Sequence, residues 1–418
     1  MIRRAAAAMV RLVAKIFFRR IELAGVERVP QSAPVIFAVN HPNALIDPLF
    51  LLGFAPRPVS FLAKAPLFRL PLIGWLARAL DAIPVYRRQD NVSTAGNRET
   101  FARARDVLQR GGVIAIFPEG TTHSDPRLRE LKTGAARIAL GASIRVNIVP
   151  TGLYYTAKQT FRSSALVYFG TPIAVEPEPV DENGEPRQES VERLTSAIER
   201  ALADVTLQAD SHAALELIAD AERIFTAGED VALARELELR KQFVAGYTYL
   251  REHDPGRLTV LESKIRQVDV EPGFSPTRRA EAHRHISSTL LLAPLGIIGA
   301  IIHWPIYRLI GLLAMHLSSN EDEMVATIKA ISGMVLYPLM WIALAVIAGF
   351  YRFEWGLIVL IVVPLLGYIA LITTETFDAI AARVRKPDLL AQQQEIREEI
   401  LSVAKSMSSL SPGAPSGA

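Results

Sequence analysis

Cysteine is absent from this 418-residue chain. The absence excludes disulfide bonds, a thiolate nucleophile and a zinc site built on cysteine, and it fits a reducing compartment. A net charge is almost absent as well, because 46 Lys and Arg residues face 43 Asp and Glu residues and leave only +3. A chain so balanced gives no indication of a nucleic-acid partner. A glycine-rich loop for cradling a phosphate is missing too, since Gly111–Gly112 is the stop of a helix.

Charged residues become scarce between residues 286 and 374, whereas they populate the chain before this region. Three apolar blocks make up the region, at 286–317, 331–351 and 355–374. The second and third are about long enough to span a bilayer, and only Arg352-Phe353-Glu354 separates them. They therefore predict a hairpin of membrane helices.

The first apolar block does not fit a simple span. As a straight helix its 32 residues would reach about 48 Å, which exceeds a hydrocarbon core of about 30 Å. It also contains Pro294, His303, Pro305 and Arg308. A broken, re-entrant or steeply tilted element is expected, with the break near Pro305. His303 is either a functional intramembrane residue or a histidine at the interface near Trp304.

The N-terminal residues predict an amphipathic helix over 1–20 that lies on a membrane surface. Arg4, Arg11, Lys15 and Arg19 are spaced seven, four and four residues apart and share one helical face. Much of the rest of the helix is apolar, through Val10, Val13, Ile16 and Phe17. The basic clusters indicate anionic membrane lipid as a partner, and the alternative to an interfacial helix is a frayed basic tail.

The apolar segment 66–80 is either a core helix or a second membrane-facing helix.

An α/β pattern occupies residues 21–205, where short β-rich runs alternate with helical stretches. The expected strands lie at 35–40, 59–64, 82–87, 113–117, 146–153 and 165–175. Residues 93–110 predict a helix, with Ser93 as its N-cap. A polar helical region is expected over 206–285, membrane helices over 286–375, and a cytoplasmic helix with a disordered tail over 376–418.

Chemistry-bearing residues follow the ends of four expected strands, where open α/β sheets place their sites. The stretches are Asn40–Asp47, 83–90 (IPVYRRQD), 116–125 (IFPEGTTHSD) and 148–153 (IVPTGL). The first of these stretches, Asn40–Asp47, places His41 and Asp47 at the end of a buried strand. Acyl transfer from a thioester to an alcohol needs a base for the hydroxyl proton, and an imidazole can accept that proton and return it to the leaving thiolate. A carboxylate beside the imidazole would orient it, as in a serine-protease triad whose serine is replaced by the substrate hydroxyl.

These four stretches resemble, in order, the four sequence blocks of the glycerophospholipid acyltransferase superfamily. The resemblance covers about residues 21–205, and residues 206–375 are similar to the C-terminal part of the fungal-type glycerol-3-phosphate/dihydroxyacetone-phosphate acyltransferases. It implies a glycerol-3-phosphate acyltransferase-like αβ sandwich with His41 as the base and Asp47 as its orienter. The family motif usually has four residues between them, whereas five intervene here. The fungal-type subgroup shares the longer spacing.

The other three blocks supply candidate substrate-binding residues. Guanidinium groups suit phosphate because their planar fork donates two parallel hydrogen bonds. Arg87 and Arg88 are therefore candidate ligands, or else a pair of surface charges. One of the two is expected to face solvent, and Arg87 is favoured as the ligand. In the third block Gly120 permits a tight turn, Glu119 fixes either the loop or a substrate hydroxyl, and Thr121 follows. The lysophosphatidic-acid branch of the superfamily typically has an arginine at the position of Thr122, and it is missing here. Phosphate binding would then depend on Arg87 or Arg88 and on Lys132, unless Lys132 is an ordinary surface charge. Pro150 either lines the acyl pocket or is structural.

A metal site built from His123 and Asp125 together with His41 is not expected, because the spacing of these residues does not match a set of metal ligands.

The expected function is an acyltransferase with no cofactor and no metal, in which acyl-CoA or acyl carrier protein is the co-substrate. The expected acceptor is glycerol 3-phosphate or dihydroxyacetone phosphate, because two arginines stand in the second block and the third-block arginine is missing. A lysophosphatidic acid or other lysophospholipid acceptor is the alternative, and a lipid-binding protein with an inactive site is the alternative from another class.

Basic residues flank the membrane region on both sides, at Arg278, Arg279, Arg284, Arg383, Arg385 and Lys386. They predict that both ends, and the catalytic domain, face the cytoplasm.

Overall fold

The computed structural model describes residues 2–69, 71–86, 96–226, 231–268, 277–318, 321–384 and 389–410. The chain forms two compact units. The first contains Met1–Gln208 together with the short segment Glu321–Thr327, and the second contains Ala209–Asn320 and Ile328–Ala418.

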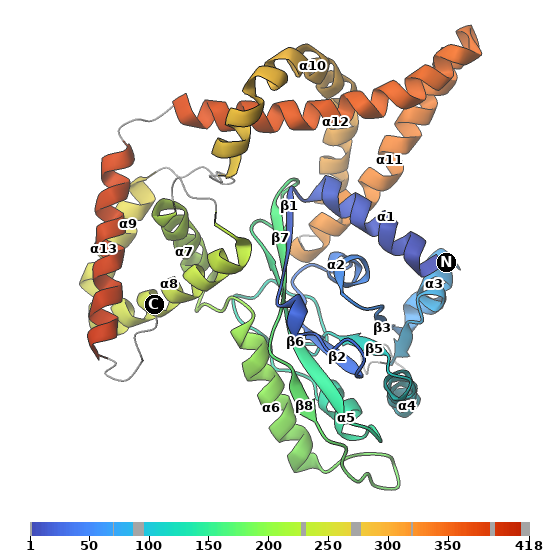
Figure 1. The fold of residues 1–418 in the computed structure, drawn as a ribbon, viewed down its shortest axis with the longest axis vertical. Helices are drawn as coiled ribbons and strands as arrows, with labels where there is room; N and C mark the ends of the chain where they lie inside the picture. The colour runs from blue at the N-terminus through green and yellow to red at the C-terminus, as the bar shows by residue number, and fades with distance from the viewer. Residues whose placement is uncertain are drawn as a thin grey trace. The chain divides into compact units, whose positions relative to one another are not determined.

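An eight-stranded sheet forms the centre of the first unit (Figure 1). Its strands are β1 (Arg20–Ala24), β2 (Val35–Val39), β3 (Ser60–Lys64), β4 (Ile83–Val85), β5 (Val113–Ile116), β6 (Val146–Tyr155), β7 (Ser164–Phe169) and β8 (Ile173–Val175). The order is β1-β7-β6-β2-β5-β3-β4, and β8 pairs with β6. All pairs are parallel except those that β6 makes with β7 and β8. All five residues of β2 are buried, as expected for a central strand covered on both faces.

Helices cover this sheet and close its core. They are α1 (Ile2–Phe17), α2 (Ile46–Phe54), α3 (Pro71–Ala79), α4 (Gly96–Gln109), α5 (Gly134–Leu140) and α6 (Gln188–Asp204). Helices α5 and α6 pack on β2 and β6, α4 packs on β4 and β5, and α1 packs on α2. The largest core cluster joins side chains of the strands to those of α4, α5 and α6, with Leu108, Ile138 and Leu202 fully buried. The α/β fold class expected from the sequence is confirmed.

The structure refines several of the expected elements. β1 was not expected, and the run expected at 165–175 divides into β7 and β8. The helix expected at 93–110 begins at Gly96 in the structure, and the proposed N-cap Ser93 lies outside the described residues. Segment 66–80 forms a short 3-10 helix (Ala65–Arg69) and α3. Arg69, Trp75 and Arg78 are exposed, which favours the membrane-facing alternative over the core helix.

Helix α1 is amphipathic, but its faces differ from the expected ones. Ala14 and Phe17 are buried, and Val10 lies against Gly53 of α2. The exposed side chains include a second apolar row, Ile2, Met9, Leu12 and Ile16, which the basic residues Arg4, Arg11 and Lys15 accompany. A surface that exposes large apolar groups beside cations suits an anionic bilayer, so the interfacial role remains the prediction.

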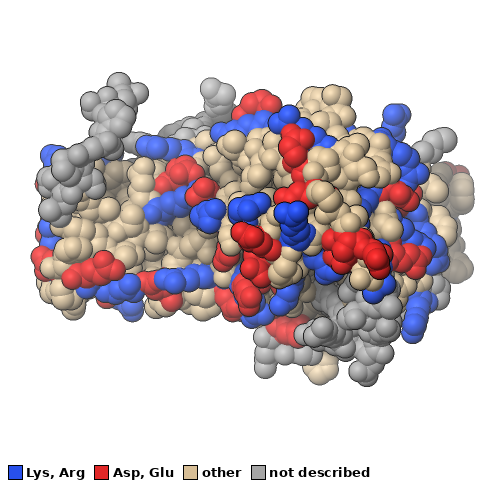
Figure 2. Space-filling model, turned by 90° about the horizontal axis from the view of Figure 1, so that it is seen from below, with Lys and Arg blue, Asp and Glu red and all other residues tan. Residues whose placement is uncertain are grey.

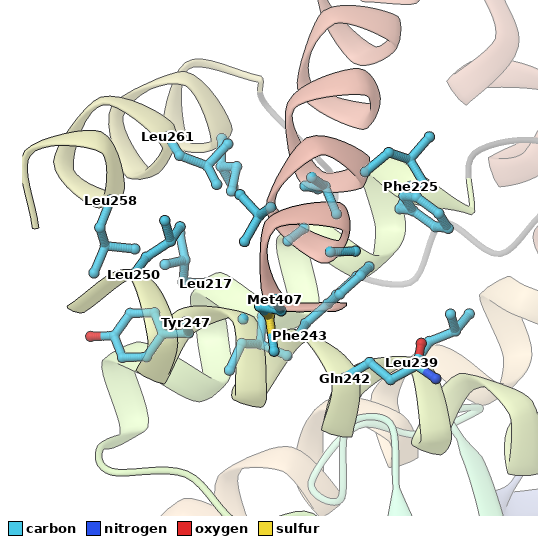
Figure 3. A pocket seen from close by; sticks show the side chains of 18 residues that line it. Leu217, Phe225, Leu239, Gln242, Phe243, Tyr247, Leu250, Leu258, Leu261 and Met407 are labelled. Carbon is cyan, nitrogen blue, oxygen red and sulfur yellow. The ribbon is translucent and has the colours of Figure 1, made fainter. Parts of the chain in front are cut away.

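The second unit is helical. It contains α7 (His212–Phe225), α8 (Leu233–His253), α9 (Pro255–Gln267), α10 (Thr277–Leu317), α12 (Phe353–Val384), α13 (Leu389–Leu410) and most of α11 (Asp322–Tyr351). Helix α13 packs on α7, α8 and α9 through an apolar cluster to which it contributes Ile396 and Val403. These four helices enclose a cavity of about 150 Å³, lined almost entirely by apolar side chains (Figure 3). The cavity contains none of the residues of the four sequence blocks.

Helices α10, α11 and α12 are each long and apolar enough to cross a membrane, over Leu291–Leu317, Asp322–Tyr351 and Phe353–Phe377. Many large apolar side chains on them are exposed, as in a protein surrounded by lipid. The chain is therefore a membrane protein. The break expected near Pro305 is not seen, because helical structure continues through Pro294 and Pro305; Figure 1 shows α10 bent instead.

Small residues allow α10 and α12 to approach each other closely. A Cβ atom at Gly299 of α10 would lie 2.1 Å from the carbonyl oxygen of Leu366 on α12. One at Gly367 of α12 would lie 2.7 Å from the His303 ring of α10. Since lipid gives no hydrophobic force between helices, close packing of this kind is a main source of their association.

Charges of both signs are mixed on the face seen in Figure 2, where Lys and Arg side chains alternate with Asp and Glu. No single basic field covers that face. The mixture agrees with the net charge of +3, and it gives no sign of a surface for nucleic acid.

Candidate active site

The loop between β2 and α2 is anchored where it leaves the sheet. The side-chain amide of Asn40 donates to the carbonyl oxygen of Leu153 at 3.1 Å and accepts from the Leu153 amide at 2.7 Å. Leu153 lies on β6, which pairs in parallel with β2. The next residue, His41, therefore starts from a fixed position at the carboxyl ends of two central strands.

His41 and Asp47 form the hydrogen-bonded pair that the sequence predicts. Nδ1 of His41 lies 2.8 Å from Oδ2 of Asp47, in the first turn of α2, where the helix dipole favours a carboxylate. Ala44 has a φ of 31°, a left-handed conformation, in the turn that brings Asp47 back toward His41. A carboxylate can only accept, so Nδ1 carries the proton and Nε2 presents a lone pair.

The free nitrogen of His41 is accessible. Its side chain is 16% exposed, and in the described parts of the chain Nε2 has no hydrogen-bond partner. The ring stacks on Phe117, with 4.1 Å between centroids and 23° between planes. The imidazole is thus held by a carboxylate at one nitrogen and by an aromatic face, while the other nitrogen can take a proton from a ligand.

Asp47 is fully buried, and several donors satisfy it. Oδ2 also accepts from the Asn43 amide at 2.7 Å, and Oδ1 accepts from the Tyr155 hydroxyl at 2.8 Å. Burial and the neighbouring carboxylate raise the pKa of Tyr155 well above its usual value. Its hydroxyl therefore keeps its proton and donates.

Glu119 fixes the loops around His41. Its carboxylate is 3% exposed, which agrees with a loop-fixing role and leaves little access for a substrate hydroxyl. Oε1 accepts from the His41 amide at 3.1 Å, Oε2 accepts from the Arg129 amide at 3.0 Å, and Oε2 also bonds Nε2 of His123. One buried carboxylate thus joins three segments.

His123 is a part of this network that the sequence analysis considered only for a metal. Its amide donates to the His41 carbonyl at 3.3 Å, and its Nδ1 accepts from the Asp125 amide at 3.2 Å. Because Nδ1 accepts, Nε2 carries the proton that bonds Glu119. The described residues contain no group of three or more His, Cys, Asp or Glu side chains that could hold a metal ion.

The remaining predicted residues lie at different distances from this centre. Gly120 has a φ of 75°, and a Cβ there would lie 3.3 Å from Cγ of Lys132, so the Lys132 stem passes over the turn. Lys132 and Thr121 are exposed, in agreement with a substrate-facing position. Pro150 is buried within β6 and its carbonyl accepts from the Gly170 amide, which favours its structural alternative. Arg87 and Arg88 lie outside the described residues.

A second set of hydrogen bonds joins the first turn of α11 to the loop that carries His41. Lys158 donates to the Pro42 carbonyl at 3.0 Å and to the Ser124 hydroxyl, and Ser124 donates to Glu323. Burial lowers the pKa of Lys158, and the nearby acidic groups Glu323, Asp322 and Asp47 oppose that shift. All of these residues belong to the first unit.

The pair and its surroundings have the geometry that a general base needs, at the strand ends of an α/β domain. Comparison with known proteins identifies the domain. Residues 20–154 match the family described as Acyltransferase, so the chain carries an acyltransferase domain. The resemblance drawn from the four sequence blocks is confirmed.

Relatives of known function extend the similarity beyond this domain. Glycerol-3-phosphate O-acyltransferase 1 of Saccharomyces cerevisiae is 24% identical over 80% of this chain and 59% of its own length. Glycerol-3-phosphate O-acyltransferase 2 of the same yeast is 27% identical over 60% of this chain and 38% of its own. The chain thus spans about half the length of these relatives.

Two further similarities cover less of this chain. The 1-acyl-sn-glycerol-3-phosphate acyltransferase LPAT1 of Arabidopsis thaliana is 33% identical over 34% of this chain and 38% of its own length. The crystal structure of the 1-acyl-sn-glycerophosphate acyltransferase PlsC from Thermotoga maritima has a TM-score of 0.34 and 20% identity, over 48% of this chain and 80% of that chain.

Proposed function

We propose that this protein transfers a fatty acyl group from acyl-CoA or acyl carrier protein to a hydroxyl of glycerol 3-phosphate or dihydroxyacetone phosphate. The observation that carries the proposal is the His41–Asp47 pair inside an acyltransferase domain, with an Nε2 that no described side chain or backbone group bonds. Residues Lys132, Arg87 and Arg88 are proposed to bind the acceptor phosphate.

The reaction uses the pair in two proton transfers. Nε2 of His41 takes the acceptor's hydroxyl proton as the oxygen attacks the thioester carbonyl carbon. Asp47 stabilises the imidazolium that forms. The tetrahedral intermediate then collapses, the carbon–sulfur bond breaks, and the imidazolium returns the proton to the leaving thiolate. The products are an ester and a free thiol, and His41 is neutral again.

The choice of acceptor rests on the relatives and on one residue. The yeast glycerol-3-phosphate acyltransferases align with more of this chain than LPAT1 does, and Thr122 stands where the lysophosphatidic acid branch typically has an arginine. A lysophosphatidic acid acceptor is the second candidate, because LPAT1 is 33% identical over its shorter alignment, whereas the yeast enzymes are 24% and 27% identical over longer ones.

A turnover assay with the purified full chain in lipid nanodiscs separates these functions. Radiolabelled acyl-CoA is supplied with either glycerol 3-phosphate or lysophosphatidic acid, and acyl carrier protein replaces CoA in a parallel series. We expect the higher kcat/KM with glycerol 3-phosphate. The reverse preference would establish the second candidate, and no transfer to either acceptor from either donor would exclude both.

We also propose that the catalytic domain lies on the cytoplasmic side and that α10 enters and leaves the membrane on that side. Packing of α13 on α7, α8 and α9 supports an even number of crossings between them, because it joins the chain before and after the membrane helices. Lys264 of α9 strengthens this contact by pairing with Glu395 and Glu399 at 2.9 and 3.0 Å. Helices α11 and α12 supply two crossings. The bond between Glu323 and Ser124 supports a start of α11 beside the catalytic domain.

Single cysteines in this cysteine-free chain can report the topology. Glu321 is exposed at the start of α11, and Phe353 is 74% exposed at the α11–α12 turn. An impermeant maleimide applied to intact cells should label Phe353→Cys and leave Glu321→Cys unlabelled until the cells are opened. Labelling at 321 alone would show that α10 crosses the bilayer completely.

A further inference from the structure

Tyr155 contacts the catalytic pair without touching the reacting atoms. It is the last residue of β6, and its hydroxyl donates to Oδ1 of Asp47 at 2.8 Å. The two residues are 108 positions apart in the sequence. The ring of Tyr155 packs on those of Phe18 and Phe50, with centroids 5.7 Å away in both cases.

The hydrogen bond matters because Asp47 has no access to solvent. Its side chain is 0% exposed, so a donor removed from Oδ1 cannot be replaced by bulk water. The other oxygen, Oδ2, is held by His41 and Asn43. Tyr155 is thus the side chain that fixes the second oxygen, and with it the plane of the carboxylate that faces His41.

Packing alone does not require the hydroxyl. A phenylalanine would keep the contacts with Phe18 and Phe50, which involve only the ring. What a phenylalanine would lose is a proton donor to a buried anion, an interaction stronger than a bond between neutral groups.

We propose that Tyr155 is a positioning residue that orients Asp47 and withdraws part of its negative charge, thereby setting how readily His41 gives up its proton. The proposal deepens the proposed function and rests on it. With the Tyr155 donor in place, the hydroxyl takes up part of the carboxylate charge, so Asp47 attracts an imidazolium less strongly. Without it, this attraction is stronger and the His41 ring is no longer held in one orientation.

Other titratable groups also face the pair. Lys158 lies on the segment after β6, and Glu119 and His123 lie on the segment after β5. A change at Tyr155 leaves the contacts of these three residues in place, so it isolates the effect of one hydroxyl.

The first experiment compares Tyr155→Phe with Tyr168→Phe. Tyr168 is a half-buried tyrosine on β7, whose ring stacks under the Arg28 guanidinium, so it controls for the loss of a phenol from the same sheet. We expect Tyr155→Phe to lower kcat about tenfold, with the KM of both substrates within about twofold of wild type. Tyr168→Phe should keep wild-type kcat. Wild-type kcat in Tyr155→Phe, or an equal loss in Tyr168→Phe, would overturn the proposal.

A second experiment does not depend on turnover. The rate at which diethyl pyrocarbonate modifies His41 is followed by mass spectrometry across pH, because only the unprotonated ring reacts. The midpoint should lie about half a pH unit higher in Tyr155→Phe than in wild type. An unchanged midpoint refutes the role of Tyr155 whether or not the protein transfers acyl groups. If the midpoint is shifted in Tyr155→Phe but the wild-type protein shows no turnover, the proposed function alone is refuted.

A double variant tests whether Tyr155 acts through Asp47. If Tyr155 acts through the carboxylate, adding Tyr155→Phe to Asp47→Asn should lower kcat by less than twofold further. A full tenfold further loss would show that Tyr155 acts independently of Asp47, which contradicts the proposal. Melting curves of each variant confirm that the rates are compared among folded proteins.

Discussion

Two histidines in different regions of the molecule use their nitrogens differently. His41, at the end of a buried strand, bonds a carboxylate through Nδ1 and leaves Nε2 open. His303, within α10, donates from Nδ1 to the Gly299 carbonyl at 2.8 Å, and its Nε2 accepts from the Trp341 indole of α11 at 3.0 Å. Both of its nitrogens are occupied.

The difference separates the environment of the proposed base from a structural one. A carboxylate partner stabilises the imidazolium, so His41 can take up a proton and give it back. A helix carbonyl and an indole fix the neutral ring, so His303 joins α10 to α11 as an interhelical hydrogen bond. The hydrogen-bond partner of His303 is Trp341 of α11, and the indole of Trp304 lies beside Arg308. Because both ring nitrogens of His303 are used in hydrogen bonds, the structure favours a packing role over a functional one. The interfacial position near Trp304 stays a prediction.

The largest expected effect tests this contrast directly. His41→Ala should lower kcat by about 10²–10⁴-fold and leave the fold intact, because it removes the general base. His303→Ala is the matched change in the membrane region, and its kcat should stay within about threefold of wild type. Comparable losses in both variants would show that the two histidines are not functionally distinct.

Asp47→Asn should cause a smaller loss than His41→Ala, on the order of 10–100-fold in kcat, since the base remains but its orientation and the stabilisation of its charge are weakened. Steady-state rates with saturating donor and acceptor measure the effect. A silent substitution would mean that, with five residues between the two side chains, another group orients His41.

Close helix packing gives a third prediction, which concerns stability. Gly299→Leu would force a side chain against the Leu366 carbonyl and should destabilise the α10–α12 contact by about 1–3 kcal/mol. Gly311→Leu on the same helix is the control, because a Cβ there meets nothing within 4 Å. Thermal denaturation in nanodiscs compares them, and equal melting temperatures would contradict the packing argument.

The smallest expected effect lies at the rim of the catalytic site. Lys132→Ala should raise the KM for the phosphate-bearing acceptor about three- to tenfold and leave the KM for the acyl donor unchanged, because it removes one charge from the proposed phosphate site. Arg87→Ala is expected to act in the same direction. Lys241→Ala, a surface lysine that pairs with Glu238 on α8, controls for the loss of a cation. Equal changes in both KM values would indicate a structural role.

Local pattern was enough to predict β2 and the pairing of His41 with Asp47, because these lie within thirteen consecutive residues. It failed for β1, whose half-exposed residues show no strict alternation and whose partner β7 lies more than 140 residues further along the chain. Tyr155 and His123 were missed for the same physical reason. Their roles come from hydrogen bonds between residues that only the folded sheet brings together, and local periodicity does not predict such contacts.

The contact between Glu323 and Ser124 has a mechanical consequence. Helix α11 is continuous from Asp322 to Tyr351, so its first turn, which bonds the segment that follows Glu119 and His123, begins a helix that is apolar enough to cross a membrane. Ser124 also accepts from Lys158, whose amine donates to the Pro42 carbonyl next to His41. A displacement of the first turn of α11 would therefore be passed through three hydrogen bonds to the loop that carries His41, so a change at one end of a membrane helix has a direct route to the proposed base.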